Sequence, residues 1–286
     1  MVEVKPIIKY RGGKTKEIAL FEQYLPHSYD HYIEPFFGGG ALYFHLEPKK
    51  AIINDINSRL MNFYSEIQGN FNEVSKQLTE LHARYEHNQA LYEELKKSTP
   101  DQRVVNENEA LYYSIRDMFN YKVLSPYLDA VLYFFINKTA YSGMIRYNAK
   151  GEFNVPFGRY KNFNTQLLTT AHHSLLQSAC IHNQDYAAIF DLAQTKDFMF
   201  LDPPYDCIFN DYGNEEYVEG FGESEHRRLG EDFKNLTCKA LMVIGKTPLT
   251  VEIYQKYIKD EYFKSYAVNI RNRFKSQTQH LVIANY

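Results

Sequence analysis

The feature that most constrains this sequence is a run of four apolar residues, 198–201, that ends in Asp202-Pro203-Pro204-Tyr205. Such a run predicts a short buried strand, and the prolines, which lack a backbone N–H, stop it abruptly. In open α/β folds, ligands bind at the carboxyl ends of strands. The turn is rich in hydrogen-bond acceptors, and Tyr205 adds a flat ring. It therefore suits a planar base with an exocyclic amino group. The alternative is a proline turn with a packed tyrosine.

A strand–turn–helix pattern lies earlier in the chain. Residues 32–36 predict a strand, Gly38-Gly39-Gly40 a turn, and a helix is expected from about residue 41. This is the local geometry of a nucleotide-binding βα unit, but the glycines do not fit G-x-G-x-x-G, so a dinucleotide is not indicated. The next predicted strand, 51–53, leads to Asp55, and a carboxylate in that place commonly accepts hydrogen bonds from ribose hydroxyls. A helix N-cap at Asp55 or Asn57 is the alternative.

Residues 5–14 form a third candidate segment. Ile7-Ile8 predicts a short strand, and Gly12-Gly13 predicts a turn whose backbone a ligand could approach closely. Tyr10 could stack on a ring and Lys14 could meet a carboxylate. A turn with a solvated lysine is the alternative.

Residues 58–127 show helical periodicity that is interrupted at 98–101, and 131–136 predict a buried helix or strand. Residues 137–161 then hold five basic residues against one acid, a local charge of +4, interleaved with aromatic rings. A hairpin is expected around Ala149-Lys150-Gly151. A basic, aromatic hairpin suits phosphate contacts and wedging between bases. The alternative is a solvated hairpin.

The α/β pattern returns after residue 163. Strands are expected at 179–182 and 241–244, helices at about 186–192 and 221–233, and an antiparallel terminal pair at 266–268 and 280–284. The acidic residue Asp185 could approach a cofactor ring at the end of the strand that precedes it.

Composition narrows the classes of function. The net charge of -3 gives no overall basic signal, so a nucleic-acid partner would need a local basic patch. Cys180, Cys207 and Cys238 form no disulfide or zinc pattern, which indicates a reducing, cytoplasmic location. No run reaches the roughly twenty apolar residues that a membrane span needs.

Three motifs carry a resemblance to a known family. Asp-Pro-Pro-Tyr resembles the catalytic motif of the amino-methyltransferases. F-x-G-x-G at residues 36–40 resembles the loop with which these enzymes bind S-adenosylmethionine (AdoMet). Residues 137–161 resemble the recognition hairpin of Dam-type DNA adenine methyltransferases. Their order matches the D12 class, or α group. The resemblance covers nearly the whole chain and is weakest at 65–130.

The resemblance implies an α/β, Rossmann-like AdoMet-dependent methyltransferase sheet with an inserted, mainly helical DNA-recognition domain. The catalytic domain would span 1–58 and 166–286, and the recognition domain 59–165 with its hairpin at 137–161. The implied reaction is methyl transfer from AdoMet to N6 of a flipped adenine in double-stranded DNA, within GATC, without a metal or a covalent enzyme intermediate.

The family's functional residues map onto matching positions of this sequence. The implied catalytic residues are Asp202, Pro203, Pro204 and Tyr205. The implied AdoMet-binding residues are Tyr10, Gly12, Gly13, Lys14, Glu34, Pro35, Phe36, Gly38, Gly40, Asp55, Asp185 and Asp202. The implied DNA-binding residues are Lys9, Tyr141, Ser142, Met144, Arg146, Asn148, Lys150 and Pro156, with Tyr141 as the wedge and Arg146 as the reader of a guanine.

Several alternatives stay open. Ser142 replaces the asparagine of the enteric enzymes, which bears on the recognition sequence. The same chemistry could serve another short site as the modification half of a restriction system, with a cognate endonuclease as partner. Methylation of cytosine N4, RNA or a protein amide would fit Ser or Asn better than Asp202. A silent DNA-binding protein would not need the intact glycine loop. A monomer or weak dimer is expected.

Overall fold

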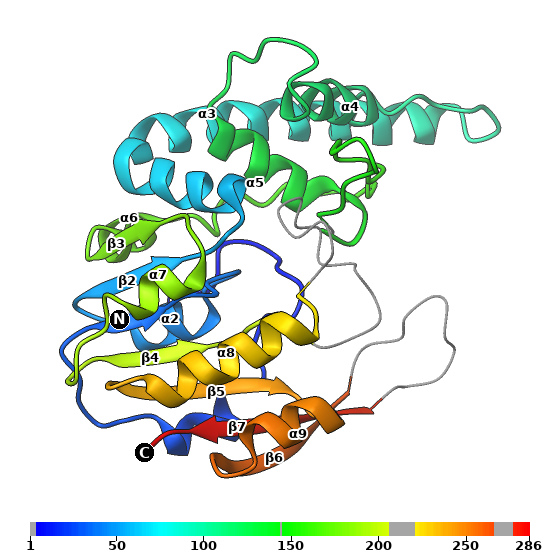
Figure 1. Cartoon of the computed structure of the whole chain (residues 1–286). Helices are drawn as coiled ribbons and strands as arrows, with labels where there is room; N and C mark the ends of the chain where they lie inside the picture. The colour runs from blue at the N-terminus through cyan, green and yellow to red at the C-terminus, as the bar shows by residue number, and fades with distance from the viewer. Residues whose placement is uncertain (1–3, 144, 206–220, 266–276) are drawn as a thin grey trace.

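The computed structural model describes residues 4–143, 145–205, 221–265 and 277–286. Seven strands of the described part form one sheet: β1 (Tyr32–Glu34), β2 (Ala51–Asn54), β3 (Ala179–His182), β4 (Phe198–Leu201), β5 (Lys239–Gly245), β6 (Ile258–Ser265) and β7 (Gln277–Ala284). Their order is β3-β2-β1-β4-β5-β7-β6 (Figure 1), and β7 runs antiparallel to both of its neighbours, β5 and β6. The strand order reverses between β1 and β4, so the carboxyl ends of these two strands form the edge where α/β proteins bind ligands.

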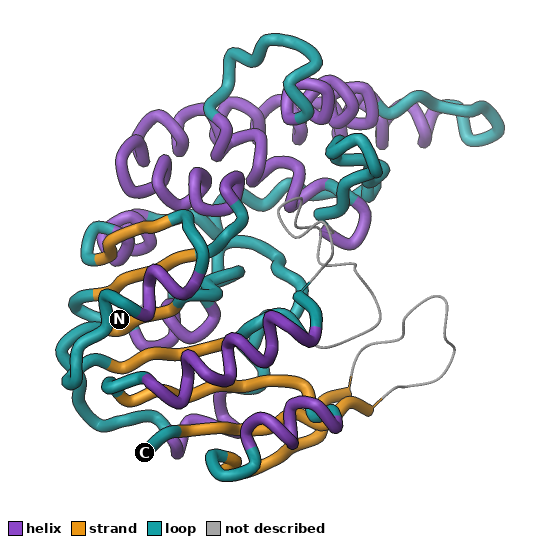
Figure 2. Tube along the Cα trace, viewed as in Figure 1, coloured by secondary structure: helices purple, strands orange, loops and turns teal. Residues whose placement is uncertain are grey.

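The described helices are α1 (Ile18–Phe21), α2 (Ala41–Leu46), α3 (Ser58–Ser98), α4 (Glu107–Phe119), α5 (Asp129–Thr139), α6 (Thr170–Leu176), α7 (Tyr186–Phe190), α8 (Glu223–Asn235) and α9 (Pro248–Tyr254), with 3-10 turns at Glu22–Tyr24 and Tyr141–Gly143. Figures 1 and 2 show α7, α8 and α9 in front of the sheet, and α3, α4 and α5 as a helical layer beside its β3 end. Helix α3 kinks at Asn70, which has non-helical backbone angles.

The sheet has a hydrophobic core on each face. Successive residues of a strand point to opposite faces, so Phe198 and Phe200 of β4 enter one core, and Met199 and Leu201 enter the other. All four are buried, which explains why the strand reads as a continuous apolar run. The core containing Met199 is closed by α7, α8 and α9.

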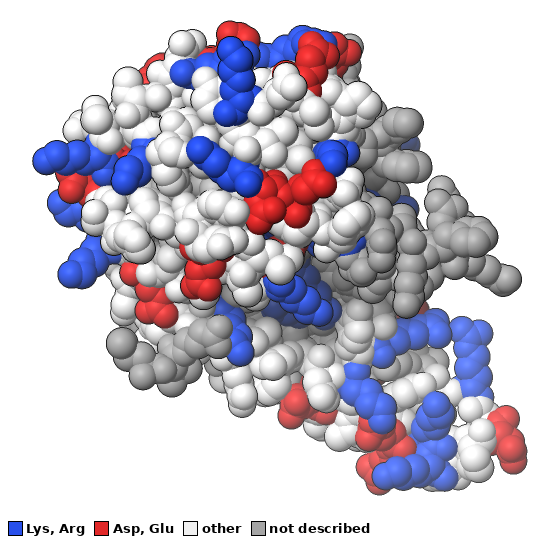
Figure 3. All heavy atoms as spheres, turned by 90° about the horizontal axis from the view of Figure 1, so that it is seen from below, with Lys and Arg blue, Asp and Glu red and all other residues white. Residues whose placement is uncertain are grey.

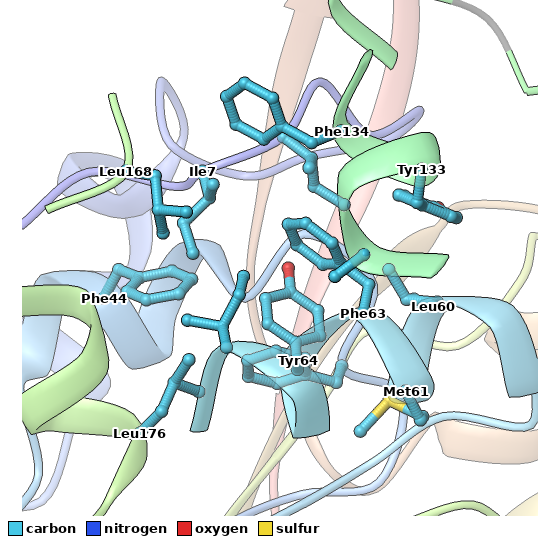
Figure 4. Close-up of a cluster of buried hydrophobic side chains, with 14 of the residues drawn as sticks. Ile7, Phe44, Leu60, Met61, Phe63, Tyr64, Tyr133, Phe134, Leu168 and Leu176 are labelled. Carbon is cyan, nitrogen blue, oxygen red and sulfur yellow. The ribbon is translucent and has the colours of Figure 1, made fainter. Parts of the chain in front are cut away.

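The other core continues from the sheet into the helical layer. In Figure 4, Phe44 of α2 lies in one cluster with Phe63 and Tyr64 of α3 and with Phe134 of α5. The hydroxyl of Tyr64 also donates to the Gly38 carbonyl, at 3.2 Å. The helices that carry the predicted recognition hairpin are therefore packed directly onto the layer that holds the glycine loop.

Most predicted elements are confirmed. Residues 131–136, predicted as a buried helix or strand, are helical and lie inside α5. Ile7-Ile8 is wrong as a strand, because both residues are buried in a bend. The helix after Asp185 ends at Phe190, earlier than expected. Residues 280–284 lie in β7, which pairs antiparallel with β6, whereas the predicted strand 266–268 lies outside the described residues. The proposed domain boundaries at 58 and 166 stay a prediction.

Basic and acidic side chains are both scattered among uncharged residues on the face seen in Figure 3, in keeping with the small net charge. No helix in the described part of the chain combines the length and the apolar character that crossing a bilayer requires. Cys180 and Cys238 are free thiols, whereas Cys207 lies outside the described residues.

Candidate active site

A cavity opens at the carboxyl ends of β1 and β4, where the strand order reverses. Four separate stretches of sequence line it: the 10–14 segment, the loop from Glu34 to Ala41, residues 54–56 after β2, and the turn from Asp202 to Tyr205. Gln184 and Tyr186 close it from the end of β3. The 10–14 segment, the glycine loop and the Asp202–Tyr205 turn, which the sequence predicted as parts of a site, thus meet in one cavity, because all three follow or cover the same edge of the sheet.

The glycine loop is shaped by the ring of Tyr10. Gly38 and Gly40 have φ angles of +49° and +64°, which side chains rarely adopt. A Cβ on Gly38 would stand 2.7 Å from Cε1 of Tyr10. A side chain at position 38 would therefore collide with the Tyr10 ring. Gly12, with φ of +82°, has open space where a Cβ would point, which leaves room for a ligand over this turn.

Asp55 ties the glycine loop to the start of α3. One of its carboxylate oxygens accepts the Gly38 N–H at 2.9 Å and the other accepts the Asn57 N–H at 3.0 Å. Asn57 is the N-cap of α3 and accepts the N–H of Leu60. Asp55 also lines the cavity, so a carboxylate held by the backbone faces the space above the loop.

Lys14, which is buried, and Asp202, which is partly exposed, form an ion pair in the cavity wall. The Lys14 Nζ lies 2.6 Å from Asp202 Oδ1 and 3.0 Å from the Gly12 carbonyl oxygen, and its side chain is 1% exposed. Burial raises the pKa of Asp202 above its ordinary value, and the charge of Lys14 opposes that rise. The Lys14 ammonium also stands 4.9 Å from the centroid of the Tyr205 ring, so one lysine contacts both predicted catalytic side chains.

Glu34 is the third acidic residue of the cavity. It is 2% exposed and accepts a 2.7 Å hydrogen bond from the Tyr32 hydroxyl. Burial raises the pKa of Glu34 well above its usual range, although the hydrogen bond from Tyr32 acts in the opposite direction.

Asp185 is not among the residues that line the cavity. It caps α7 and binds Arg228 through two hydrogen bonds, of 2.8 and 3.2 Å, while its neighbours line the cavity.

The basic segment forms a hairpin without regular strands. Isolated bridges join Tyr147 to Phe153 and Ala140 to Phe157. Asn148 builds the turn, since its side-chain oxygen accepts the N–H groups of Lys150 and Glu152. Arg146 is exposed and donates from Nε to Asn154 at 3.1 Å, whereas Met144 lies outside the described residues.

Tyr160 connects the hairpin to the N-terminal segment, a role that the sequence did not reveal. Its hydroxyl accepts the Ser142 N–H at 3.0 Å, and the Lys9 ammonium lies 4.7 Å from its ring centroid. Asn137 pairs with both backbone groups of Lys9. Tyr141, 45% exposed, stands beside them at the surface. The structure therefore brings together Lys9, Tyr141 and Ser142, which the sequence assigned to one ligand.

The sheet order, the glycine loop and the Asp-Pro-Pro-Tyr turn define an AdoMet-dependent methyltransferase of the amino-methylating class. The chain matches the model of the D12 class N6 adenine-specific DNA methyltransferases over residues 10–270, and it belongs to that family. It is an adenine-specific DNA methyltransferase.

Its relatives include modification enzymes and methylases of the Dam type. The chain is 36% identical to the Type II methyltransferase M.CviBI of Paramecium bursaria Chlorella virus NC1A, over 99% of this chain and 100% of the relative. It is 32% identical to the Type II methyltransferase M.MjaIII of Methanocaldococcus jannaschii, over 89% and 88%. It is 29% identical to the DNA adenine methylase of Salmonella typhi, over 89% and 86%.

Proposed function

We propose that the cavity at the ends of β1 and β4 binds AdoMet and that Asp202 acts there on N6 of an adenine flipped out of double-stranded DNA. The family uses AdoMet, and the donor set of the cavity fits it. Two carboxylates, those of Asp55 and Asp202, line a space that suits a cationic sulfonium. The observation that carries the proposal is that the acceptor-rich turn and the glycine loop open into the same cavity.

The chemistry requires little from the protein beyond positioning and charge. A flipped base leaves its stack at a cost of a few kcal/mol, and stacking on Tyr205 would offset part of it. The Asp202 carboxylate and the Pro203 carbonyl accept hydrogen bonds from N6, which favours a tetrahedral nitrogen with an available lone pair. AdoMet, when bound, supplies the electrophilic methyl group. A tritiated methyl-transfer assay on unmethylated duplex, single-stranded DNA and RNA tests the proposal, and transfer restricted to RNA would refute it.

Asp55 provides a direct test of the cofactor site. Asp55→Ala is expected to weaken AdoMet binding by about 1–3 kcal/mol, or roughly 5- to 150-fold in Kd, because a charged hydrogen-bond acceptor is lost. Asp55→Asn is the matched control, since the amide oxygen can still accept the Gly38 N–H and should preserve the loop. Isothermal calorimetry measures both. Unchanged affinity in the alanine variant would remove Asp55 from the AdoMet site.

The hairpin is the proposed reader of the DNA sequence. Arg146 is exposed and held by Asn154, and an arginine fork matches O6 and N7 of guanine. Arg146→Ala is therefore expected to lose about 1–3 kcal/mol and to relax discrimination at one base pair. Methylation rates on a set of duplexes with single substitutions measure this loss. Equal losses on every duplex would contradict base reading by Arg146.

Lys161 supplies the control for that experiment. Its side chain is 78% exposed and lies 3.4 Å from Glu93. We propose that it meets a phosphate, because an exposed ammonium pairs with the backbone charge whatever the base sequence. Lys161→Ala should weaken binding to all sequences alike and flatten the salt dependence.

We propose GATC as the methylated site, because Lys9 and Arg146 match positions that contact DNA in GATC-methylating relatives. Sequencing of single DNA molecules that were methylated in a host without its own adenine methyltransferase identifies the site. Modified adenines at any other sequence would refute GATC and leave the chemistry untouched.

A second candidate role is the modification half of a restriction system, favoured by the names of two relatives as Type II methyltransferases. A cognate endonuclease that fails to cut the methylated DNA would support it.

A further inference from the structure

A buried polar cluster lies behind the Asp-Pro-Pro-Tyr turn. At its centre is Glu17, which is 4% exposed. Its Oε2 accepts the Tyr262 hydroxyl at 2.8 Å and stands 2.9 Å from Nδ1 of His280, and its Oε1 accepts from the Lys264 ammonium. These partners come from β6 and β7, so the cluster joins the N-terminal segment to the antiparallel end of the sheet.

The carboxylate of Glu17 is ionised, and this fixes the imidazole of His280. Burial alone would raise the pKa of Glu17, but the hydrogen bond from His280 and the charges of Lys14 and Lys264 lower the pKa to about 2. An ionised carboxylate only accepts hydrogen bonds, so Nδ1 of His280 must carry the proton. The ring of His280, which is fully buried, is thereby held in one orientation.

The cluster contacts Tyr205 directly and reaches Asp202 through Lys14. The ring of His280 meets the ring of Tyr205 edge to face, with 5.1 Å between centroids and 68° between planes. On the other side of the turn, the Glu17 N–H donates to the Lys14 carbonyl at 2.7 Å, and Lys14 in turn holds Asp202. Glu17 is thus one residue removed from each of the two groups that would meet the target adenine.

We propose that Glu17 and His280 are positioning residues for methyl transfer. Glu17 orients His280, and the ring contact with His280 sets the plane of Tyr205, on which the flipped base stacks. Edge-to-face contacts between rings have a preferred geometry, so they can hold an aromatic plane. The inference rests on the proposed role of Tyr205 and extends it to a residue 75 positions further along the chain.

A double-mutant cycle between His280 and Tyr205 tests this role. His280→Ala is expected to slow single-turnover methyl transfer by roughly 10- to 100-fold, as other small misplacements of reacting groups do, and to leave AdoMet affinity unchanged. In a Tyr205→Ala background, His280→Ala should cause almost no further loss, because the group through which it acts is gone. Additive losses in the two backgrounds would overturn the proposal.

Two further variants separate positioning from general stability. His172→Ala removes another buried histidine that makes an edge-on ring contact, at 5.5 Å to Phe44, and should lower stability without changing the single-turnover rate. Glu17→Gln keeps the size and one acceptor oxygen, so it tests the same coupling to Tyr205 if His280→Ala does not fold. A 2-aminopurine at the target position should show weaker base flipping in His280→Ala and not in His172→Ala. Absence of transfer by the unmodified enzyme would refute the proposed function itself, whereas additivity would refute only the positioning role.

Discussion

Asp202→Ala is expected to abolish methyl transfer, with a loss in rate on the order of 10³-fold or more. In the proposed mechanism the turn offers two acceptors for the adenine amino group, and the Asp202 carboxylate is the charged one. Its removal leaves N6 as a delocalised, poorly nucleophilic amine. A tritiated methyl-transfer assay on unmethylated duplex DNA measures the rate, and calorimetric AdoMet binding shows whether the cavity has survived.

The alanine variant also removes the partner of a buried ammonium. Lys14 is 1% exposed, so its charge would be left without the carboxylate 2.6 Å away. Asp202→Asn is the better-matched variant, because an amide oxygen can still accept a hydrogen bond from Lys14 or from N6. We expect it to fold and to retain more activity than the alanine variant. Substantial turnover by the purified Asp202→Ala variant would contradict a catalytic role for Asp202.

Lys14→Met should destabilise the fold by about 1–3 kcal/mol near neutral pH, because it leaves the Asp202 carboxylate, whose side chain is 21% exposed, without its ionic partner. Chemical denaturation measures the free energy of unfolding. Lys246→Met is the control, since Lys246 pairs with Glu261 at the surface, where an ion pair contributes about 1 kcal/mol or less. Similar losses in the two variants would contradict a stabilising role for the partly buried pair of Lys14 and Asp202.

The destabilisation by Lys14→Met should depend on pH with a defined sign. Burial already raises the pKa of Asp202 above 3.8, and removal of the opposing charge of Lys14 raises it further. A carboxyl whose folded pKa exceeds its unfolded value favours the fold below the unfolded value, and this advantage is lost as pH rises through the folded pKa. The variant should therefore be least affected near pH 4 and most affected above neutrality. The acidic limb of its pH–rate profile should move to higher pH.

Local sequence determined the parts of the site that depend on neighbouring residues. Four apolar residues before two prolines specify a buried strand with a stopped end, since proline cannot continue the hydrogen-bond ladder. The glycine loop was predictable for the same kind of reason, because Gly38 and Gly40 adopt positive φ angles that glycine tolerates. The short hairpin was predictable from its turn, although its strands proved too irregular to form a ladder.

Tertiary structure decided which of these pieces touch. The pairing of Lys14 with Asp202 joins residues 188 positions apart, and that of Glu17 with His280 joins residues 263 apart. Neither pair can be predicted from hydrophobic periodicity or from turn residues, because a long-range ion pair constrains two side chains without altering the local backbone preference. Sequence therefore specified the acceptor-rich turn and the family that carries it. Only the closing of β6 and β7 against the N-terminal segment placed a buried carboxylate and a histidine behind that turn, since their burial depends on the whole sheet being assembled.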